Sequence, residues 1–308
     1  VKRTLGAYKT NGDNFSKSIE EMIELAALAS KELQTTSKRD WTVYDDGYIE
    51  KRAEENKYEA SMEDALKNGE FLMYLQPQLS ITENKATGCE ALVRWQISED
   101  EIVQPAGFID LFEKNGFIRE LDKYMFNSAC QRIRKWIDSG KKPFSIAINV
   151  SQKDILSRTF ISDYVEMKEK YNVPDGLLEV EFSESIIVEN ENLMINILEE
   201  FKKHGIRTAI DDFGAGCTSL NILNYACVDT LKIDKGFFVE CHQCERKKLV
   251  VESIVKMAKV LGMSVVAEGI EKEKQIEFLR SIDCEYLQGY VIDKPLPVSE
   301  FENKYLQL

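Results

Sequence analysis

Two adjacent aspartates, Asp211 and Asp212, are the residues whose types and spacing point most directly to chemistry. One carboxylate of such a pair can bridge two divalent cations while its neighbour binds only one. Two cations about 3.5 to 4 Å apart are a common centre for phosphodiester hydrolysis, because they activate water and neutralise charge on phosphorus. The alternative is a turn or a helix cap, where aspartate is common. Gly214 and Gly216 would let the following loop turn tightly.

Further polar side chains stand at or near the ends of short apolar runs. They are Glu90, Asn149, Glu181, Lys232 and Glu268. Carboxylates gathered in one pocket raise one another's pKa unless cations compensate them. The two histidines, His204 and His242, do not stand at the end of such a run. The ligands would therefore all be oxygens, which favours Mg²⁺ or Mn²⁺ over zinc.

The elements that must position these residues alternate along the chain from about residue 61. Eight apolar, often β-branched segments predict strands, at 71–76, 89–95, 144–150, 177–183, 207–212, 228–234, 264–268 and 284–291. Helical patterns lie between most of them, at 106–139 (long enough for two helices), 160–171, 192–204, 246–261 and 273–281. The alternation predicts an α/β fold, either a closed TIM-type (β/α)8 barrel or an open doubly wound sheet.

The polar residues of the predicted strands favour the barrel. An open sheet needs such residues only beside its switch point. Here nearly every strand carries one at or near its C-terminal end, and the set is Gln76, Glu90 with Arg94, Asn149, Glu181, Asp211 with Asp212, Lys232 with Asp234, Glu268 and Gln288. In a barrel all eight ends converge on one mouth, where the active site of this architecture lies.

Composition restricts the partners and the compartment. The 308 residues carry a formal net charge of −13, whereas a long nucleic acid would need a basic face. No run approaches the roughly 20 apolar residues of a membrane span, so we expect no membrane contact from this fragment. Seven scattered cysteines indicate reduced thiols and a cytoplasmic location, although the full-length protein could be anchored in a membrane elsewhere. The Cys-His-Gln-Cys run at 241–244 lacks the second ligand pair of a closed zinc site.

The first 60 residues differ from the rest. Residues 13–16 could cap a helix whose apolar face would be Ile19, Met22, Ile23, Ala26 and Ala27. Residues 41–44 predict a short strand, and the charge-dense stretch at 45–59 predicts a solvated helical linker. We therefore divide the chain into a small segment at 1–60 and one domain at 61–308. The start at Val1 suggests an excerpt from a longer protein.

Seven segments of the larger part resemble the EAL domain in order and spacing. They are EALVRW at 90–95, NVS at 149–151, EFSES at 181–185, DDFG at 211–214, LKID at 231–234, AEGIE at 267–271 and QGY at 288–290, with Pro295 following. The resemblance covers about residues 62–308. It implies a barrel with one reversed strand that hydrolyses the bacterial second messenger cyclic di-GMP to linear pGpG with Mg²⁺ or Mn²⁺.

The resemblance also implies which residues bind metal. They are Glu90, Asn149, Glu181, Asp211 and Asp212. The first four would hold one cation, Asp211 would bridge to a second, and Asp212 would serve the second alone.

Catalytic and substrate roles are implied in the same way. Lys232 would orient or polarise the attacking water, Glu268 is the favoured general base, and Gln288 would position water or substrate. The implied substrate contacts are Gln76 and Arg94, the latter through a guanidinium fork that matches phosphate. Glu184 would anchor the loop that follows Asp212.

Two residues of that loop depart from the EAL pattern. Where the family usually has Thr and Tyr, this sequence has Ala215 and Cys217. Neither is a ligand, but the family associates this loop with metal occupancy and with a homodimer contact. A catalytically weak cyclic di-GMP receptor or regulatory module is therefore the main alternative to an active enzyme, and a structural partner-binding module is a third. The complete set of ligand positions favours the enzyme.

The N-terminal segment resembles the closing strand, helix and strand of a GGDEF domain. The GGDEF signature itself is absent from the sequence. The resemblance implies an upstream GGDEF or sensory domain in the full-length protein.

Overall fold

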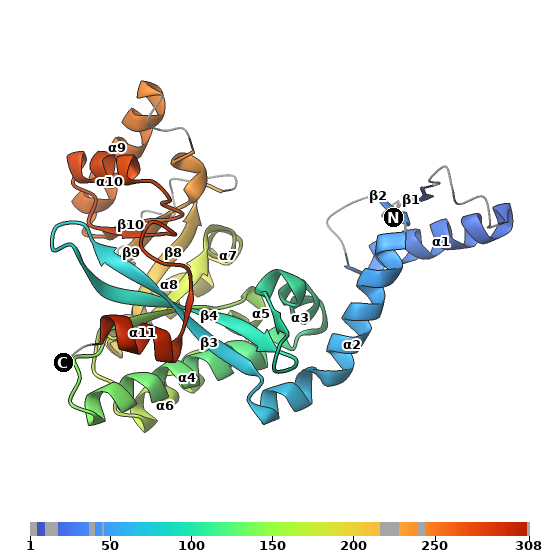
Figure 1. The fold of residues 1–308 in the computed structure, drawn as a ribbon, viewed down its shortest axis with the longest axis horizontal. Helices are drawn as coiled ribbons and strands as arrows, with labels where there is room; N and C mark the ends of the chain where they lie inside the picture. The colour runs from blue at the N-terminus through green and yellow to red at the C-terminus, as the bar shows by residue number, and fades with distance from the viewer. Residues whose placement is uncertain are drawn as a thin grey trace. The chain divides into compact units, whose positions relative to one another are not determined.

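The computed structural model of the protein describes residues 5–9, 18–36, 41–44, 46–215, 228–239 and 244–306 (Figure 1). The chain divides into two compact units. The smaller comprises Val1–Asn68 and Ala106–Asn115, and the larger comprises Gly69–Pro105 and Gly116–Leu308. Among the helices of the described residues, none is both long and apolar enough to cross a membrane.

In the smaller unit, two parallel strands lie beside one helix. They are β1 (Leu5–Tyr8) and β2 (Trp41–Tyr44), and the helix is α1 (Ile19–Thr36). Gly6 permits the close packing, because a Cβ there would lie 1.8 Å from the carbonyl oxygen of Ala26. The helix begins with a reciprocal capping box between Ser18 and Glu21. The cap predicted at 13–16 lies outside the described residues.

The apolar face predicted for α1 is only partly covered. Met22 and Ala26 are half-buried, whereas Ile19 and Ile23 are 72% and 63% exposed. The physical reason is the width of the sheet, since two strands about 4.8 Å apart cover only a narrow stripe of a helix.

Helix α2 (Asp46–Asn68) follows, and it continues across residue 61, where the domain boundary was predicted. It ends before Gly69, whose φ of +74° suits the residue after a helix. Most of its side chains at 51–68 are exposed or half-buried, in keeping with the charged composition. A 3₁₀ turn (Pro105–Gly107) leads to helix α3 (Ile109–Asn115) of the same unit, whose Lys114 lies 3.8 Å from Glu55 of α2.

Eight strands of the larger unit close into a barrel, which confirms the predicted fold (Figure 1). In order around the ring they are β3 (Phe71–Ser80), β11 (Tyr286–Gln288), β10 (Ser264–Ala267), β9 (Thr230–Ile233), β8 (Arg207–Phe213), β7 (Leu178–Ser183), β6 (Ser145–Asn149) and β4 (Lys85–Gln96). Neighbours pair in parallel except at β3, which is antiparallel to both β4 and β11. Two short strands, β5 (Ile102–Val103) and β12 (Leu296–Pro297), pair with β4 and β3 outside the ring.

The reversed strand is β3, because the four residues at 81–84 lead directly from β3 into β4. Antiparallel strands can be joined by a short turn, whereas parallel strands need a long crossover. This hairpin corrects two predicted positions. Gln76 and Glu90 lie opposite each other in the middle of long strands, not near strand ends. Alternation along each strand lets them share one face with Gln78 and Leu92.

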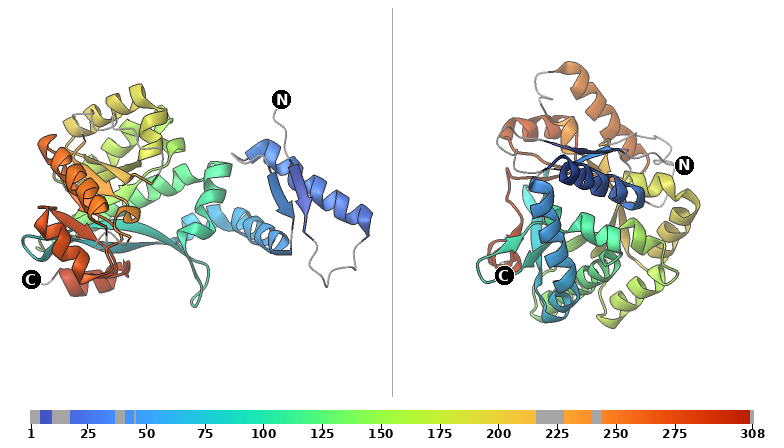
Figure 2. Two further views of the ribbon diagram at one scale, coloured as in Figure 1. Left: turned by 90° about the horizontal axis from the view of Figure 1, so that it is seen from above. Right: turned by 90° about the vertical axis from the view of Figure 1, so that its right-hand side faces the viewer.

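Helices lie on the outside of the barrel (Figure 2). They are α4 (Ile118–Asp138), α5 (Gln152–Ile155), α6 (Phe160–Lys170), α7 (Glu184–Glu189), α8 (Glu191–Lys203), α9 (Glu245–Val260), α10 (Glu273–Ser281) and α11 (Val298–Tyr305). Aromatic side chains join neighbouring helices, as where the rings of Phe126 in α4 and Tyr164 in α6 lie 4.4 Å apart. Every helix predicted within 106–281 is present.

Candidate functional site

A cleft of about 450 Å³ opens at the mouth of the barrel. Six of the predicted site residues line it, namely Gln76, Glu90, Asp211, Asp212, Glu268 and Gln288. They come from β3, β4, β8, the end of β10, and β11, so residues up to 212 positions apart in sequence share one wall. The tertiary fold therefore brings the predicted acids and glutamines together.

Lys232 of β9 lies beneath this cleft with its side chain almost completely buried. Its Nζ is within ion-pair distance of four carboxylates, at 2.8 Å from Glu181, 2.9 Å from Asp211, 3.0 Å from Glu268 and 3.3 Å from Glu90. One positive charge is thus shared among four acids. The local excess of negative charge suits a cation-binding centre.

Burial and mutual repulsion shift the pKa values of this group. Burial raises the pKa of Glu268 to about 8; Lys232 opposes the shift, while Asp211 and Glu90 add to it. Burial, and then Glu90, raise the pKa of Glu181 well above its usual value. Burial alone would lower the pKa of Lys232, but the surrounding carboxylates outweigh it and hold the pKa well above the ordinary value.

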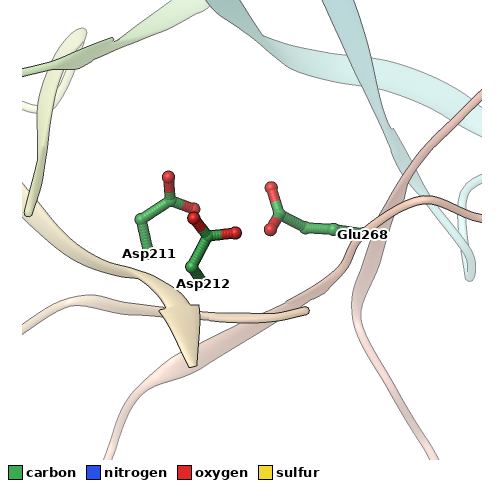
Figure 3. A group of neighbouring side chains, drawn as sticks. All are labelled: Asp211, Asp212 and Glu268. Atoms are coloured by element: carbon green, nitrogen blue, oxygen red, sulfur yellow. The ribbon is translucent and has the colours of Figure 1, made fainter. Parts of the chain in front are cut away.

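A β-bulge presents Asp211 and Asp212 to the same place. Successive residues of a regular strand point to opposite faces. Here the pairing of β8 with β9 shifts register between Ile210 and Phe213, and Asp212 has a φ of +53°. Aspartate tolerates this left-handed conformation better than most residues. Figure 3 shows both carboxylates directed toward Glu268.

Hydrogen bonds orient the other predicted ligands and glutamines. The Asn149 amide donates to Glu90 Oε1 at 2.8 Å. The Gln288 amide donates to Glu90 Oε2 at 2.5 Å and to Gln76 Oε1 at 3.1 Å. Both oxygens of Glu90 therefore accept hydrogen bonds from side chains of other strands, Asn149 on β6 and Gln288 on β11, which restricts the rotation of the carboxylate.

The predicted loop anchor, Glu184, lies at the start of α7 and is buried. Its Oε2 accepts a hydrogen bond from the backbone N–H of Gly214 at 3.0 Å. Gly214 has a φ of +92°, and a Cβ there would lie 2.0 Å from the ring of Phe237, so only glycine suits this turn. Ala215 follows it, while Cys217 and Gly216 lie outside the described residues.

Arg94 is not among the residues that line the cleft. It lies two residues beyond Leu92 on β4, with its guanidinium 5.4 Å from the centre of the Tyr74 ring and Nη1 donating to the carbonyl of Val93. Asp234 also lines the cleft, and its carboxylate accepts from the N–H of Gly236 at 2.7 Å.

The residues present fit a pair of hard cations. Asp211, Asp212 and Glu268 place carboxylate oxygens within 4.8 Å of one another (Figure 3). Oε1 of Glu181 is buried and accepts no hydrogen bond from any residue the structure describes. A buried carboxylate oxygen without a donor is costly unless a cation binds it. All of these ligand atoms are oxygens, which Mg²⁺ and Mn²⁺ prefer.

Two supporting residues were missed by the sequence analysis. Gln78 donates to Gln288 Oε1 at 3.1 Å, and alternation from Gln76 along the strand was the signal that could have found it. Asp122 of α4 accepts from the N–H of Ser151 at 2.8 Å and so supports the turn after Asn149. No local sequence pattern predicts the contact between Asp122 and Ser151, because the two residues are 29 positions apart.

Comparisons with known proteins agree with this geometry. The family model described as the EAL domain matches residues 59–295. Signaling protein YkoW of Bacillus subtilis is 32% identical over 282 residues, which are 92% of this chain and 35% of YkoW. Cyclic di-GMP phosphodiesterase NbdA of Pseudomonas aeruginosa is 29% identical over 289 residues, which are 94% of this chain and 37% of NbdA. The chain thus spans little more than a third of these relatives.

Solved structures share the fold. The PaMucR phosphodiesterase in complex with c-di-GMP matches with a TM-score of 0.74 at 29% identity, covering 80% of this chain and 99% of that one. The EAL enzyme Bd1971, with cAMP and cyclic di-GMP bound, matches with a TM-score of 0.75 at 26% identity, covering 92% of this chain and 74% of that one.

Proposed function

The chain belongs to the EAL domain family, and on this premise we propose that it is a metal-dependent phosphodiesterase that hydrolyses cyclic di-GMP to linear pGpG. The observation that carries the proposal is the group of four carboxylates around buried Lys232, at the base of an open cleft. A catalytically silent module would have no use for so many buried acids, because burying them is costly.

The metal-binding roles follow from the donor set. Glu90, Asn149, Glu181 and Asp211 would hold one Mg²⁺ or Mn²⁺ ion, and Asp211 and Asp212 would hold a second. When bound, the two cations would neutralise phosphate charge and lower the pKa of a water molecule. The free oxygen of Glu181 and the bulge at Asp211 and Asp212 support this assignment.

Lys232 and Glu268 would handle the attacking water. The Lys232 ammonium carries three donors and would orient that water while holding the surrounding carboxylates in position. Glu268 would accept its proton. The pKa of about 8 that burial imposes on Glu268 falls when positive charge is added nearby, so the carboxylate would be available at neutral pH.

Gln76, Gln288 and Arg94 would bind the substrate. The two glutamines line the cleft and carry amide groups that can contact phosphate or base edges. Arg94 would meet a phosphate from the outer part of β4, since its guanidinium presents a planar fork of donors. Glu184 would hold the loop beside Asp212 through Gly214.

The direct test is to incubate the purified chain with cyclic di-GMP and Mn²⁺ or Mg²⁺ and follow pGpG by chromatography. Glu90→Gln, which keeps the shape and removes the charge, should lower the rate more than about 100-fold, because even outer-shell partners of a metal centre are worth about 10- to 100-fold. Glu99→Gln, at an exposed position after the same strand, is the matched control. A chelator should abolish turnover of the wild type.

The other outcomes separate the alternatives. Binding of cyclic di-GMP without formation of pGpG would favour the receptor. The first residue to change back to the family's usual type would then be Ala215, by Ala215→Thr. If the chain neither binds nor hydrolyses cyclic di-GMP, the proposal is wrong.

We also propose a domain context, a location and an oligomeric state for the chain. The β1-α1-β2 order of the smaller unit supports a remnant of a GGDEF-like domain at 1–60, ahead of an EAL domain at 61–308. Upstream, the full-length protein would carry a GGDEF or sensory domain. Cys89, Cys130, Cys244 and Cys284 are free thiols, which supports a cytoplasmic location. A homodimer would form through the region of the metal-site loop.

A further inference from the structure

Four buried side chains form a continuous hydrogen-bonded chain across the barrel wall. Gln78 Nε2 donates to Gln288 Oε1 at 3.1 Å. Gln288 Nε2 donates to Gln76 Oε1 at 3.1 Å and to Glu90 Oε2 at 2.5 Å. Gln76 Nε2 then donates to the backbone carbonyl of Asp293 at 3.2 Å. Each of the four side-chain residues is at most 8% exposed.

The direction of this chain is determined by its ends. Glu90 Oε2 and the backbone carbonyl of Asp293 both accept hydrogen bonds in this chain. Gln288 must therefore turn its NH₂ group toward Glu90, which leaves its own oxygen on the opposite side. Gln78 supplies a donor at that oxygen, so its amide matches the required direction.

Strand register explains why Gln78 reaches Gln288. The two residues are directly paired in the antiparallel contact of β3 with β11, while Gln76 is paired with Glu90 across β3 and β4. The reversed strand thus stands between the strand of Gln288 and the strand of Glu90. Gly88 faces Gln78 across β3 and β4. A Cβ at Gly88 would lie 3.1 Å from Gln78 Oε1 and 2.7 Å from the Ser145 hydroxyl.

We propose that Gln78 is a positioning residue, which holds the Gln288 amide in the orientation that donates to the metal ligand Glu90. The inference rests on the proposed metal-dependent function. Gln76, Glu90 and Gln288 line the cleft, whereas Gln78 acts through Gln288 from behind it. Without Gln78, the Gln288 oxygen loses its donor, so fewer hydrogen bonds restrict the Gln288 amide in the orientation that donates to Glu90.

The test is the affinity for Mn²⁺, measured without substrate by the electron paramagnetic resonance signal of the free ion. Gln78→Met keeps the volume and removes the donor, and it should raise the dissociation constant about fivefold, the loss expected for one buried hydrogen bond. Gln78→Leu is a second apolar variant in case the first fails to fold. The Ser80 hydroxyl, on the same strand, forms local hydrogen bonds with the Thr82 hydroxyl and the N–H of Glu83, so Ser80→Ala should stay within about twofold of wild type.

A double-mutant cycle distinguishes positioning from simple filling of the barrel. Gln288→Met should weaken Mn²⁺ binding about tenfold or more. Adding Gln78→Met to that variant should change nothing further, because the intermediary is already gone. An equal effect of Gln78→Met in both backgrounds, or wild-type affinity in both Gln78 variants, would overturn the inference.

Failure of the proposed function gives a different result. A wild type that binds Mn²⁺ but does not hydrolyse cyclic di-GMP would disprove the phosphodiesterase while the cycle still decides the role of Gln78. A wild type that does not bind Mn²⁺ would overturn both.

Discussion

The Lys232 ammonium lies 2.8 Å from the Glu181 carboxylate, and both side chains are almost completely inaccessible to solvent. They come from β9 and β7, which are separated in the ring by β8, so the contact crosses the barrel interior. Taking two charges out of water is expensive, and their attraction compensates only when both partners remain. The site therefore depends on Lys232 for its stability as well as for its proposed chemistry.

Lys232→Met should destabilise the metal-free protein by about 3 to 5 kcal/mol, because four carboxylates lose their shared cation. Urea unfolding in the presence of a chelator measures this change. Mn²⁺ should restore part of the loss by replacing the missing positive charge. Lys274→Met, at an exposed position in α10, is the control and should leave stability nearly unchanged. Equal stability of the two variants would contradict the central role given to Lys232.

Mn²⁺ or Mg²⁺ should stabilise the wild-type protein against heat, since an ion that binds only the folded state adds about 2.7 kcal/mol at 100 times its dissociation constant. Asp211→Asn should lose most of this stabilisation, because a shared ligand becomes neutral. Differential scanning calorimetry with and without a chelator is the measurement. Asp100→Asn, on an exposed loop, should keep the full response. A full response in Asp211→Asn as well would exclude Asp211 as a ligand.

Glu184→Ala should release the amide of Gly214, which now donates to Glu184 at 3.0 Å. Hydrogen exchange at that amide should accelerate, and turnover should fall by about tenfold if the loop supports the second cation. Glu184→Gln retains an acceptor oxygen and should lie between the alanine variant and the wild type. Glu189→Ala, at the other end of the same helix, is the control. Unchanged exchange in Glu184→Ala would remove the basis for the anchoring role.

Asp154 should make stability depend on pH. It is fully buried and accepts from the Tyr164 hydroxyl at 2.7 Å. Burial raises its pKa, while Tyr164, Lys123 and Arg119 oppose the shift. A raised pKa means that the folded state holds the proton more tightly than the unfolded chain. The resulting stability is fully present below about pH 3.9, the unfolded value, and is lost as the pH rises through the folded pKa.

Asp154→Asn lacks this titration but keeps an oxygen for Tyr164. The free energy of unfolding of the wild type minus that of Asp154→Asn should therefore decrease from about pH 4 toward neutrality. Urea unfolding over a pH series measures the difference, with Asp100→Asn as the surface control. A difference that stays constant or increases with pH would show that the Asp154 pKa is not raised.

Much of the fold could be predicted from the sequence because its signals are local. Apolar, β-branched runs such as 144–150 and 207–212 form strands wherever they can be buried, and 3.6-residue periodicity defines helices such as α9. The number of strands and the polar residues upon them then favoured a barrel over an open sheet. The family resemblance implied one reversed strand without saying which; the structure identifies it as β3, and the hairpin turn at 81–84 is its local cause.

The sequence by itself determined which side chains could serve a two-cation centre, since residue type and position in a strand are properties of the chain. Only the tertiary structure decided how they meet. The bulge that turns Asp211 and Asp212 to one side arises from pairing with β9, and the place of Lys232 among four acids arises from closure of the ring. The link from Gln78 through Gln288 to Glu90 joins residues some 200 positions apart in sequence. Register and hydrogen-bond direction depend on partners distant in sequence, so no local pattern specifies them.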